Sequence, residues 1–371
     1  MWLVVLGAVL ACTSGAPPSQ DGTIFVSQAG SSTVVALDAG SGRLKKRIEV
    51  GFLPHTLVVS PDGKTLYVVV VGSEAIAEID TATLTLRRTF LTAPVPRTRD
   101  DGTVIQAHID RNAFAHTSCY DCHFSGGALP KYVGTRPFGV LLSPDGKQLL
   151  VSHIKSPDLT TLDLATGRIA RTVTLDSSGE ATESVALART GDAIWVARRP
   201  RQPSRAAGVL RRLDGETLAG SRDVPSGSDT GALLSLPDRG RVLASNFETN
   251  TVTELDGSGA GRVLEAAPGP LGLLALPDQR TILALDYYSN AVSFLDLDTG
   301  SSETLPLSLG ATVYVNPTQA ALSGDGSSAW IVSSGTDGHL VELDLSSRRI
   351  LRAVPIDGLS FGVAFVPLQS R

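Results

Sequence analysis

The amino-acid sequence predicts an all-β protein built as a seven-bladed β-propeller, and three observations lead to this prediction. A unit of about 40–50 residues recurs along the chain, and each unit reads as apolar strands separated by polar turns. The apolar runs are too short for helices and are rich in β-branched residues. The two ends of the chain carry complementary parts of one further unit.

Two series of aspartates mark the repeated units. One series lies in the turn between the first and second strands of a unit: Asp62, Asp145, Asp192, Asp238, Asp278 and Asp325. The other series ends the third strand: Asp38, Asp80, Asp163, Asp214, Asp256, Asp296 and Asp344. The seven members of the second series predict seven blades. The interval from Asp80 to Asp163 is 83 residues, whereas the other intervals are 40 to 51 residues, so an insertion of about 40 residues lies there.

The turns and strands of a unit have recognisable chemistry. Ser60-Pro61-Asp62-Gly63 and residues 143–146 have the same turn sequence. Proline fixes φ, aspartate bonds its own backbone and glycine tolerates a positive φ. The following runs, residues 65–71 and 148–152, are almost continuously apolar, which is typical of strands that are covered on both faces. Four such strands per unit, repeated radially, describe a propeller.

The chain ends predict how the ring closes. Residues 23–27 read as the second strand of a unit, and residues 361–366 read as a lone first strand. Pairing of these two segments would complete one blade and cover two strand edges. We therefore expect residues 22–371 to form one closed propeller.

The repeats also resemble a known family. Residues 54–68, with the strand end and turn Ile79-Asp80-Thr81-Ala82-Thr83, resemble the bacterial YVTN/YncE-like propeller repeat. The resemblance covers nearly all of residues 22–367 apart from the insertion, and the units at 180–226 and 227–269 depart most because they lack the full Ser-Pro-Asp-Gly turn. It implies an exported seven-bladed propeller but no single function.

The N-terminus reads as an export signal. Residues 1–12 are expected to form a lipoprotein-type signal peptide, because residues 2–11 are apolar and Val9-Leu10-Ala11-Cys12 resembles a bacterial lipobox that is lipidated at Cys12. No Lys or Arg precedes the apolar stretch, and Leu10 stands where a small residue is usual. Residues 13–21 follow as a polar tether. The alternative is a plain secretory signal in which Cys12 is incidental. Either reading predicts a bacterial protein that is periplasmic or a membrane-anchored lipoprotein.

Charge and hydropathy restrict the partners. The chain of 371 residues has a formal net charge of −5, which argues against nucleic acid and anionic lipid as main partners. No apolar run approaches the ~20 residues that a spanning helix needs. We therefore expect contact with a membrane only through a lipid anchor at Cys12.

The insertion, residues 94–133, carries the most specific motif. It contains Cys119-Tyr120-Asp121-Cys122-His123, a C-x-x-C-H sequence. Two thiols at this spacing can form thioethers to one haem, and the adjoining His123 can then coordinate its iron as the proximal ligand. The chain has only three cysteines, and this motif holds two of them. Residues 114–123 resemble a haem-binding segment of c-type cytochromes, and the whole chain resembles YVTN-type propellers that carry such a segment. This resemblance implies one covalently attached haem c, electron transfer and a redox partner protein.

Other interpretations of the motif remain open. Cys119 and Cys122 could form a disulfide, or a zinc site together with His108 or His116, or the motif could be a relic. In each of these cases the protein would be a haem-free extracytoplasmic propeller that binds a protein, a peptide or a glycan.

The ligand on the other side of the iron is a separate question. Met1 is the only methionine, so His/Met ligation is not available after processing. The insertion joins the outermost strand of one blade to the first strand of the next, and the face bearing it should also bear His55 and His153. We rank His153 and His55 first and His116 next as distal ligands. A five-coordinate iron would instead allow peroxidase-like chemistry.

Two further groups of side chains belong to the same face. An arginine-rich segment could pair with haem propionates or simply be solvated, and it comprises Arg198, Arg199, Arg201 and Arg205, with Arg136 beside the insertion. Tyr287 and Tyr288 lie in a connecting loop, where contact with a ligand or ordinary packing would both be consistent with the sequence.

Overall fold

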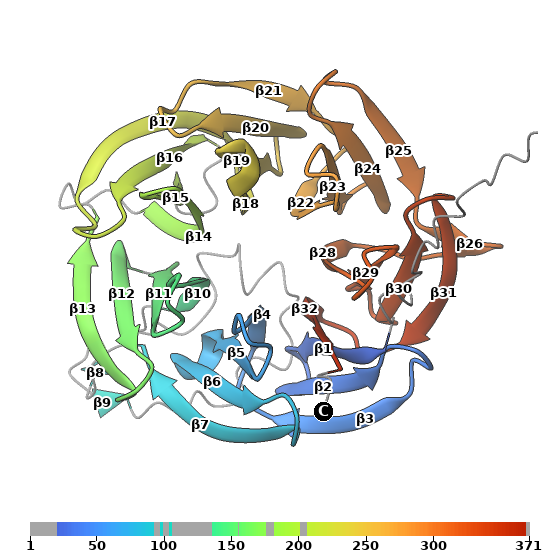
Figure 1. Ribbon diagram of the computed structural model, residues 1–371, viewed down its shortest axis with the longest axis horizontal. Coiled ribbons are helices and arrows are strands. Elements are labelled where there is room, and N and C mark those ends of the chain that lie inside the picture. Colours follow the sequence, from blue (N-terminus) through green and yellow to red (C-terminus); the bar gives the residue numbers. More distant parts are fainter. Residues whose placement is uncertain are drawn as a thin grey trace, which may run out of the picture.

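The computed structural model is a seven-bladed β-propeller (Figure 1). It describes residues 21–92, 97–98, 104–105, 136–154, 156–175, 182–200 and 206–368. Seven antiparallel four-stranded sheets are arranged around a central channel. The fold class predicted from the repeats is therefore confirmed, including the number of blades.

Each blade contributes one strand to the channel wall and a second strand behind it. The innermost strands are β32 (Ser360–Pro367), β4 (Pro54–Val59), β10 (Pro137–Leu142), β14 (Thr182–Thr190), β18 (Thr230–Leu236), β22 (Pro270–Ala275) and β28 (Pro317–Leu322). The second strands are β1 (Gly22–Gln28), β5 (Thr65–Val70), β11 (Gln148–His153), β15 (Ala193–Pro200), β19 (Arg241–Asn246), β23 (Thr281–Asp286) and β29 (Ser328–Ser333).

Two more strands complete each blade on its outer side. The third strands are β2 (Thr33–Asp38), β6 (Ala75–Asp80), β12 (Asp158–Asp163), β16 (Ala207–Asp214), β20 (Thr251–Asp256), β24 (Ala291–Asp296) and β30 (His339–Asp344). The outermost strands are β3 (Leu44–Glu49), β7 (Thr85–Leu91), β13 (Arg168–Thr174), β17 (Gly220–Ser228), β21 (Gly261–Glu265), β25 (Ser302–Pro306) and β31 (Arg349–Pro355). Each aspartate of the seven-membered series is the last residue of a third strand, as predicted.

A few short elements lie outside the blades. Two hairpins are formed by β8 (Arg97–Thr98) with β9 (Val104–Ile105), and by β26 (Ser308–Leu309) with β27 (Thr312–Val313). The described residues also include the 3-10 turns η1 (Val71–Ser73) and η3 (Pro237–Arg239). No helix in the described part of the chain is both long enough and apolar enough to cross a membrane.

The ring closes through its two ends. Strand β32 pairs antiparallel with β1, so that Phe25 lies opposite Ala364 and Thr23 lies opposite Val366 (Figure 1). One blade is thereby built from both ends of the described chain, in the order β3-β2-β1-β32. The predicted closure is confirmed.

The core lies between the blades. Every residue of β5 is buried, whereas most side chains of the outermost strand β7 are exposed. Innermost strands such as β4 and β22 are half-buried, because one side of each faces the channel. The continuously apolar sequences of the second strands therefore correctly predicted strands that are covered on both faces.

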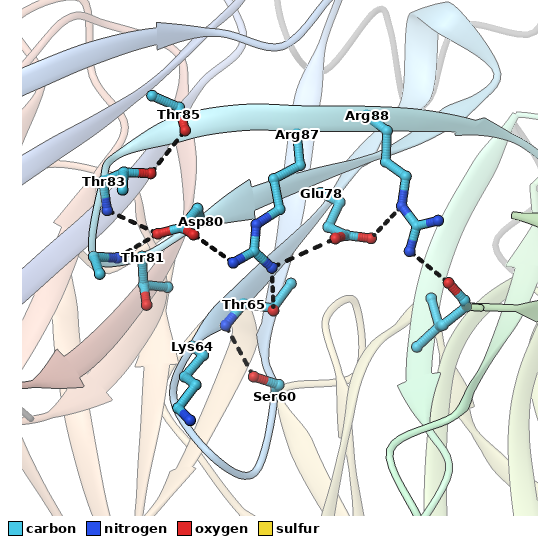
Figure 2. Close-up of polar contacts among 12 residues, drawn as sticks. Ser60, Lys64, Thr65, Glu78, Asp80, Thr81, Thr83, Thr85, Arg87 and Arg88 are labelled. Atoms are coloured by element: carbon cyan, nitrogen blue, oxygen red, sulfur yellow. Dashed lines mark hydrogen bonds and ion pairs between the residues drawn. The ribbon is translucent and has the colours of Figure 1, made fainter. Parts of the chain in front are cut away.

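Arginines on outermost strands also join neighbouring blades. In β7, Arg88 Nε donates to the buried carboxylate of Glu78 (2.8 Å), and its Nη2 donates to the backbone oxygen of Leu164 in the next blade (2.5 Å) (Figure 2). Similar bridges run from Arg262 to Glu254 and from Arg352 to Glu342, each with a further bond to a carbonyl of the following blade. These contacts join adjacent sheets.

Candidate functional site

A central cavity of about 230 Å³ lies in the channel at the middle of the ring. Its lining comes from the innermost strands of all seven blades. Three further lining residues, Arg199, Phe247 and Tyr287, lie in or directly after second strands. The remaining lining residues are His55, Thr56, Phe138, Gly139, Val140, Val185, Ala186, Leu187, Gly231, Ala232, Leu233, Leu271, Gly272, Thr318, Gln319 and Phe361. The wall is mostly apolar, which suits an apolar or aromatic ligand.

Small residues allow the innermost strands to converge around this cavity. A Cβ atom at Gly272 would lie 2.3 Å from the backbone oxygen of Thr318 on the next strand, and one at Gly362 would lie 2.3 Å from the backbone oxygen of His55. Such distances are far inside van der Waals contact. Glycine at these two positions is therefore required by the close approach of neighbouring strands.

The cavity lies towards one face of the ring, which we call the insertion face. This face carries the start of each innermost strand and the end of each second strand, including His55 and His153. Strand β7 ends at Leu91 on this face and β10 begins there at Pro137, so the insertion leaves and re-enters the ring on it. The opposite face carries the aspartate turns, and we call it the turn face.

The side chain of His55 lies between two phenylalanine rings at the cavity wall. Its ring centroid is 4.5 Å from that of Phe138 and 4.7 Å from that of Phe361, and it is nearly parallel to the latter, with an interplanar angle of 20°. Its Nδ1 is 3.1 Å from Thr56 Oγ1, whose hydroxyl also bonds the backbone oxygen of Phe138. Burial lowers the pKa of His55 to about 3. The imidazole is therefore neutral at physiological pH, which is the form that coordinates metals.

His153 has a different environment. It is fully buried at the end of β11 and is not among the residues that line the cavity. Its Nε2 is 3.0 Å from Thr160 Oγ1, seven residues further along the chain. The equivalent residues of two other blades make the same kind of bond: Asn246 to Thr253 and Asp286 to Ser293. His153 thus occupies a position that supports the packing of a blade.

The arginine-rich segment differs from the expected loop. Arg198 and Arg199 lie within β15 and are buried, because this strand runs to Pro200 and is longer than the other second strands. Arg199 forms ion pairs with Glu183 and Asp229, which joins two blades beside the cavity. Burial raises the pKa of Asp229, and the Arg199 guanidinium opposes that shift. Arg201 and Arg205 lie outside the described residues.

A group of three aromatic side chains lies on the opposite side of the ring from His55. Phe247 follows β19 and contacts both tyrosines of the β23–β24 loop, with centroid distances of 5.7 Å to Tyr287 and 4.6 Å to Tyr288. Tyr287 lines the cavity, whereas Tyr288 is 48% exposed. The loop placement of both tyrosines predicted from the sequence is confirmed, and Tyr287 faces a space that a ligand can enter.

The chain segments that flank the insertion are both bonded to Glu74. The backbone oxygen of Glu74 accepts bonds from the amide and the hydroxyl of Thr92, and its Oε1 accepts the amide of Arg136 (3.0 Å). Arg136 is buried and has a φ of 52°. Glu74, in the blade that carries His55, therefore holds together the two described segments between which the insertion lies.

Several predicted sites lie outside the described residues. These are the signal peptide with Cys12, residues 13–20 of the tether, and the insertion motif with His116, Cys119, Cys122 and His123. The structure therefore leaves their roles as predictions. In the described parts of the chain, no group of three His, Cys, Asp or Glu side chains is placed to hold a metal ion.

Sequence reasoning overlooked Phe138, Phe361, Phe247 and Glu74. A signal for the two phenylalanines does exist, because Leu53-Pro54-His55, residues 136–138 and residues 359–361 occupy the same place in three units. Aligning the units at this place would have put His55, Phe138 and Phe361 on the channel together. No comparable sequence signal marks Glu74, because its contacts are with the residues that flank the insertion, and only one blade is followed by an insertion.

The fold is similar to that of several solved structures. Hydrazine synthase from Kuenenia stuttgartiensis is 14% identical with a TM-score of 0.63, and the match covers 94% of this chain and 99% of that one. The dihydro-heme d1 dehydrogenase NirN, solved in complex with DHE, is 14% identical with a TM-score of 0.58, covering 95% of this chain and 78% of that one. A streptogramin B lyase is 15% identical with a TM-score of 0.59, covering 84% of this chain and 87% of that one.

These likenesses establish the fold and not the function, because the identities are low. No family model matches the chain, and no curated protein matches it in sequence.

Proposed function

We propose that this protein is an exported, c-type haem-binding β-propeller that takes part in electron transfer. The observation that carries the proposal is the position of His55, a neutral imidazole between two phenylalanine rings on an apolar cavity. This cavity lies towards the same face as the two ends of the segment that contains Cys119, Cys122 and His123. In this proposal the motif and the cavity would supply complementary parts of one haem site.

The described residues fit part of a haem. Phe138, Phe361 and Leu271 offer apolar cover, and His55 offers a nitrogen ligand. The cavity volume of about 230 Å³ is below the ~300–1,000 Å³ typical of pockets that enclose a whole ligand. The ring would therefore cover one side of the group, while Cys119, Cys122 and His123 would hold it from the other side. A bound haem would supply a one-electron couple.

Among the histidines, the geometry favours His55 over His153 as the distal ligand. His55 lines the cavity, whereas His153 is bonded to Thr160 inside a blade. NirN, one of the similar structures, is by name a dihydro-heme d1 dehydrogenase, so haem chemistry is associated with a chain of this fold. The export signal, with Cys12 as a lipid anchor, would place the protein where c-type haem is attached and where a redox partner protein could reach it.

Covalent haem staining tests the proposal. The full chain is expressed in a bacterial host that matures c-type cytochromes, separated on a denaturing gel and stained for haem. We expect a stained band for the wild type and an unstained band of normal abundance for Cys119→Ser/Cys122→Ser. An unstained wild-type band would overturn the proposal.

A pair of histidine variants tests the ligand. Phenylalanine already occupies the position equivalent to His55 in two other blades, as Phe138 and Phe361. Asparagine occupies the position equivalent to His153 in another blade, as Asn246. Both His55→Phe and His153→Asn are therefore compatible with the fold. We expect His55→Phe to convert a low-spin absorption spectrum into a high-spin one, and His153→Asn to leave the spectrum unchanged. The reverse pattern would assign the iron to His153.

A further inference from the structure

A second cavity, of about 270 Å³, lies near the turn face in the cleft between the β10–β13 sheet and the β14–β17 sheet. We call it the inter-blade cavity. Its wall combines the buried apolar side chains of Leu150, Ile194 and Leu218 with two arginines, Arg171 and Arg189. It is separate from the central cavity, with which it shares no lining residue.

The two arginines differ in how they are used. Arg171 donates to the backbone oxygens of Glu216 and Thr217, and so joins the two blades. Arg189 has no ion pair with any described carboxylate, and its Nε is buried without a hydrogen-bond partner among the described residues. A buried guanidinium nitrogen without an acceptor is costly, so a ligand that supplies an acceptor there would be stabilised.

The repeat shows that the fold does not require a charge at this position. Arg189 lies opposite Ile194 in the ladder, one residue from the end of the paired segment. The residues at the same register in the other six blades are uncharged: Val59, Leu142, Ser235, Ala275, Leu322 and Phe365. An arginine that breaks the pattern of its own repeat, and lies in a cavity, points to binding rather than to packing.

We propose that the inter-blade cavity binds a small organic carboxylate. The planar guanidinium of Arg189 presents paired N–H donors, a geometry that matches the two oxygens of a carboxylate. Leu150, Ile194 and Leu218 would cover the apolar part of the molecule, which distinguishes this ligand from an inorganic oxyanion. Glu216 also lines the cavity, and its exposed carboxylate lowers the affinity for any anion.

Calorimetric titration of the full chain tests this site. The probes are butyrate, isovalerate and benzoate, with 1-butanol as a neutral analogue and sodium sulfate and phosphate as inorganic anions. We expect at least one of the three carboxylates to bind, and butanol, sulfate and phosphate to bind at least about tenfold more weakly. Absence of binding by all three carboxylates, or equal binding of sulfate, would overturn the proposal.

Variants locate the binding. Arg189→Leu introduces the side chain that two other blades have at this register, Leu142 and Leu322, so the variant is compatible with the fold. It should weaken carboxylate binding by about tenfold or more. Arg43→Leu removes an exposed arginine on another blade and should bind like the wild type. Unchanged binding in Arg189→Leu would contradict the assignment. Glu216→Gln gives an independent measurement should Arg189→Leu fail to fold: tighter carboxylate binding supports the site, and unchanged affinity contradicts it.

Discussion

At the scale of single residues, one buried position recurs in the blades with different side chains. The last residue of a second strand is His153, Asn246 or Asp286 in three of the blades, and each bonds a hydroxyl seven residues further on. Asp286 is the ionisable acid of this set. Ser293 Oγ donates to its Oδ2 (2.7 Å), while its Oδ1 has no hydrogen-bond partner among the described residues. Burial raises the pKa of Asp286 to about 7.

This raised pKa makes stability depend on pH. In the unfolded chain the carboxyl group ionises near pH ~4, whereas in the folded protein it keeps its proton up to about pH 7. The folded state therefore binds more protons in this interval, and the free energy of unfolding falls as the pH rises through it. The loss is on the order of 4 kcal/mol and is complete above pH ~7.

Asp286→Asn should remove that loss, because the amide stays neutral and Asn246 already occupies the same position in another blade. We expect the variant to exceed the wild type in free energy of unfolding by on the order of 2–4 kcal/mol at pH 8 and to differ little at pH 4. Urea denaturation at several pH values measures both. A gain that is the same at pH 4 and pH 8 would show that Asp286 is not the titrating group.

The pKa of His55 predicts an effect of the opposite sign. The folded protein keeps this imidazole neutral down to about pH 3, whereas the unfolded chain protonates it near pH ~6.5. The free energy of unfolding therefore falls as the pH drops from ~6.5 towards 3. His55→Phe should make the protein less sensitive to acid in this range, as measured by the melting temperature at pH 7 and pH 4. A wild type and variant with the same acid sensitivity would contradict the neutral state of His55.

At the scale of elements, the outermost strands connect neighbouring blades through arginine. Arg88 bonds both Glu78 and the carbonyl of Leu164, while the adjacent Arg87 pairs mainly with Asp80, the last residue of β6 (Figure 2). Removing Arg88 leaves the largely buried carboxylate of Glu78 with a weaker partner, the Arg87 guanidinium at 3.7 Å. Removing Arg87 breaks an exposed pair, and such pairs contribute little.

Arg88→Met should therefore lower the free energy of unfolding by about 2 kcal/mol. Arg87→Met, one residue earlier on the same strand, is the matched control and should lower it by less than about 1 kcal/mol. Chemical denaturation of both variants under one buffer makes the comparison. Equal losses would mean that the bond between blades adds no stability.

Local sequence was sufficient to predict the strands and turns of the blades. Asp80 illustrates why, since its carboxylate accepts the amides of Ala82 and Thr83 and these turn contacts hold its pKa near 2. Such contacts involve neighbours in the chain and leave a pattern that can be read. No such sequence pattern marks Leu53, Arg136 and Leu359. Each of them has a positive φ just before an innermost strand, and its backbone oxygen accepts a hydrogen bond from the amide of the residue that follows the second strand. That geometry is imposed by the blade.

The site was predicted less completely than the fold. His55 was chosen from its place before a first strand, but the two rings that enclose it come from residues 138 and 361 of other blades. Contacts between segments so far apart depend on the closed ring and not on local sequence. For the same reason Arg198 and Arg199 were expected in a loop, whereas both lie buried in a longer strand β15, where Glu183 and Asp229 pair with Arg199.

At the scale of the whole molecule, the ring depends on the pairing of β32 with β1. Strand β32 also forms part of the wall of the central cavity, to which it contributes Phe361. Removing residues 360–371 would expose the edge of β1 and the buried faces of two blades. We expect this truncated chain to lose cooperative thermal unfolding and to aggregate on gel filtration. A chain lacking only residues 369–371 should behave as the wild type, and a monomeric, cooperatively melting 1–359 chain would contradict closure by these strands.

The proposed function requires one haem attached to this ring through Cys119 and Cys122. The most direct measurement is the intact mass of the purified, denatured protein from a host that matures c-type cytochromes. We expect a mass larger by one haem than that of the processed and lipidated polypeptide, and loss of that increment in Cys119→Ser/Cys122→Ser. A polypeptide mass without the increment, or one lowered by the two hydrogens of a disulfide, would contradict it.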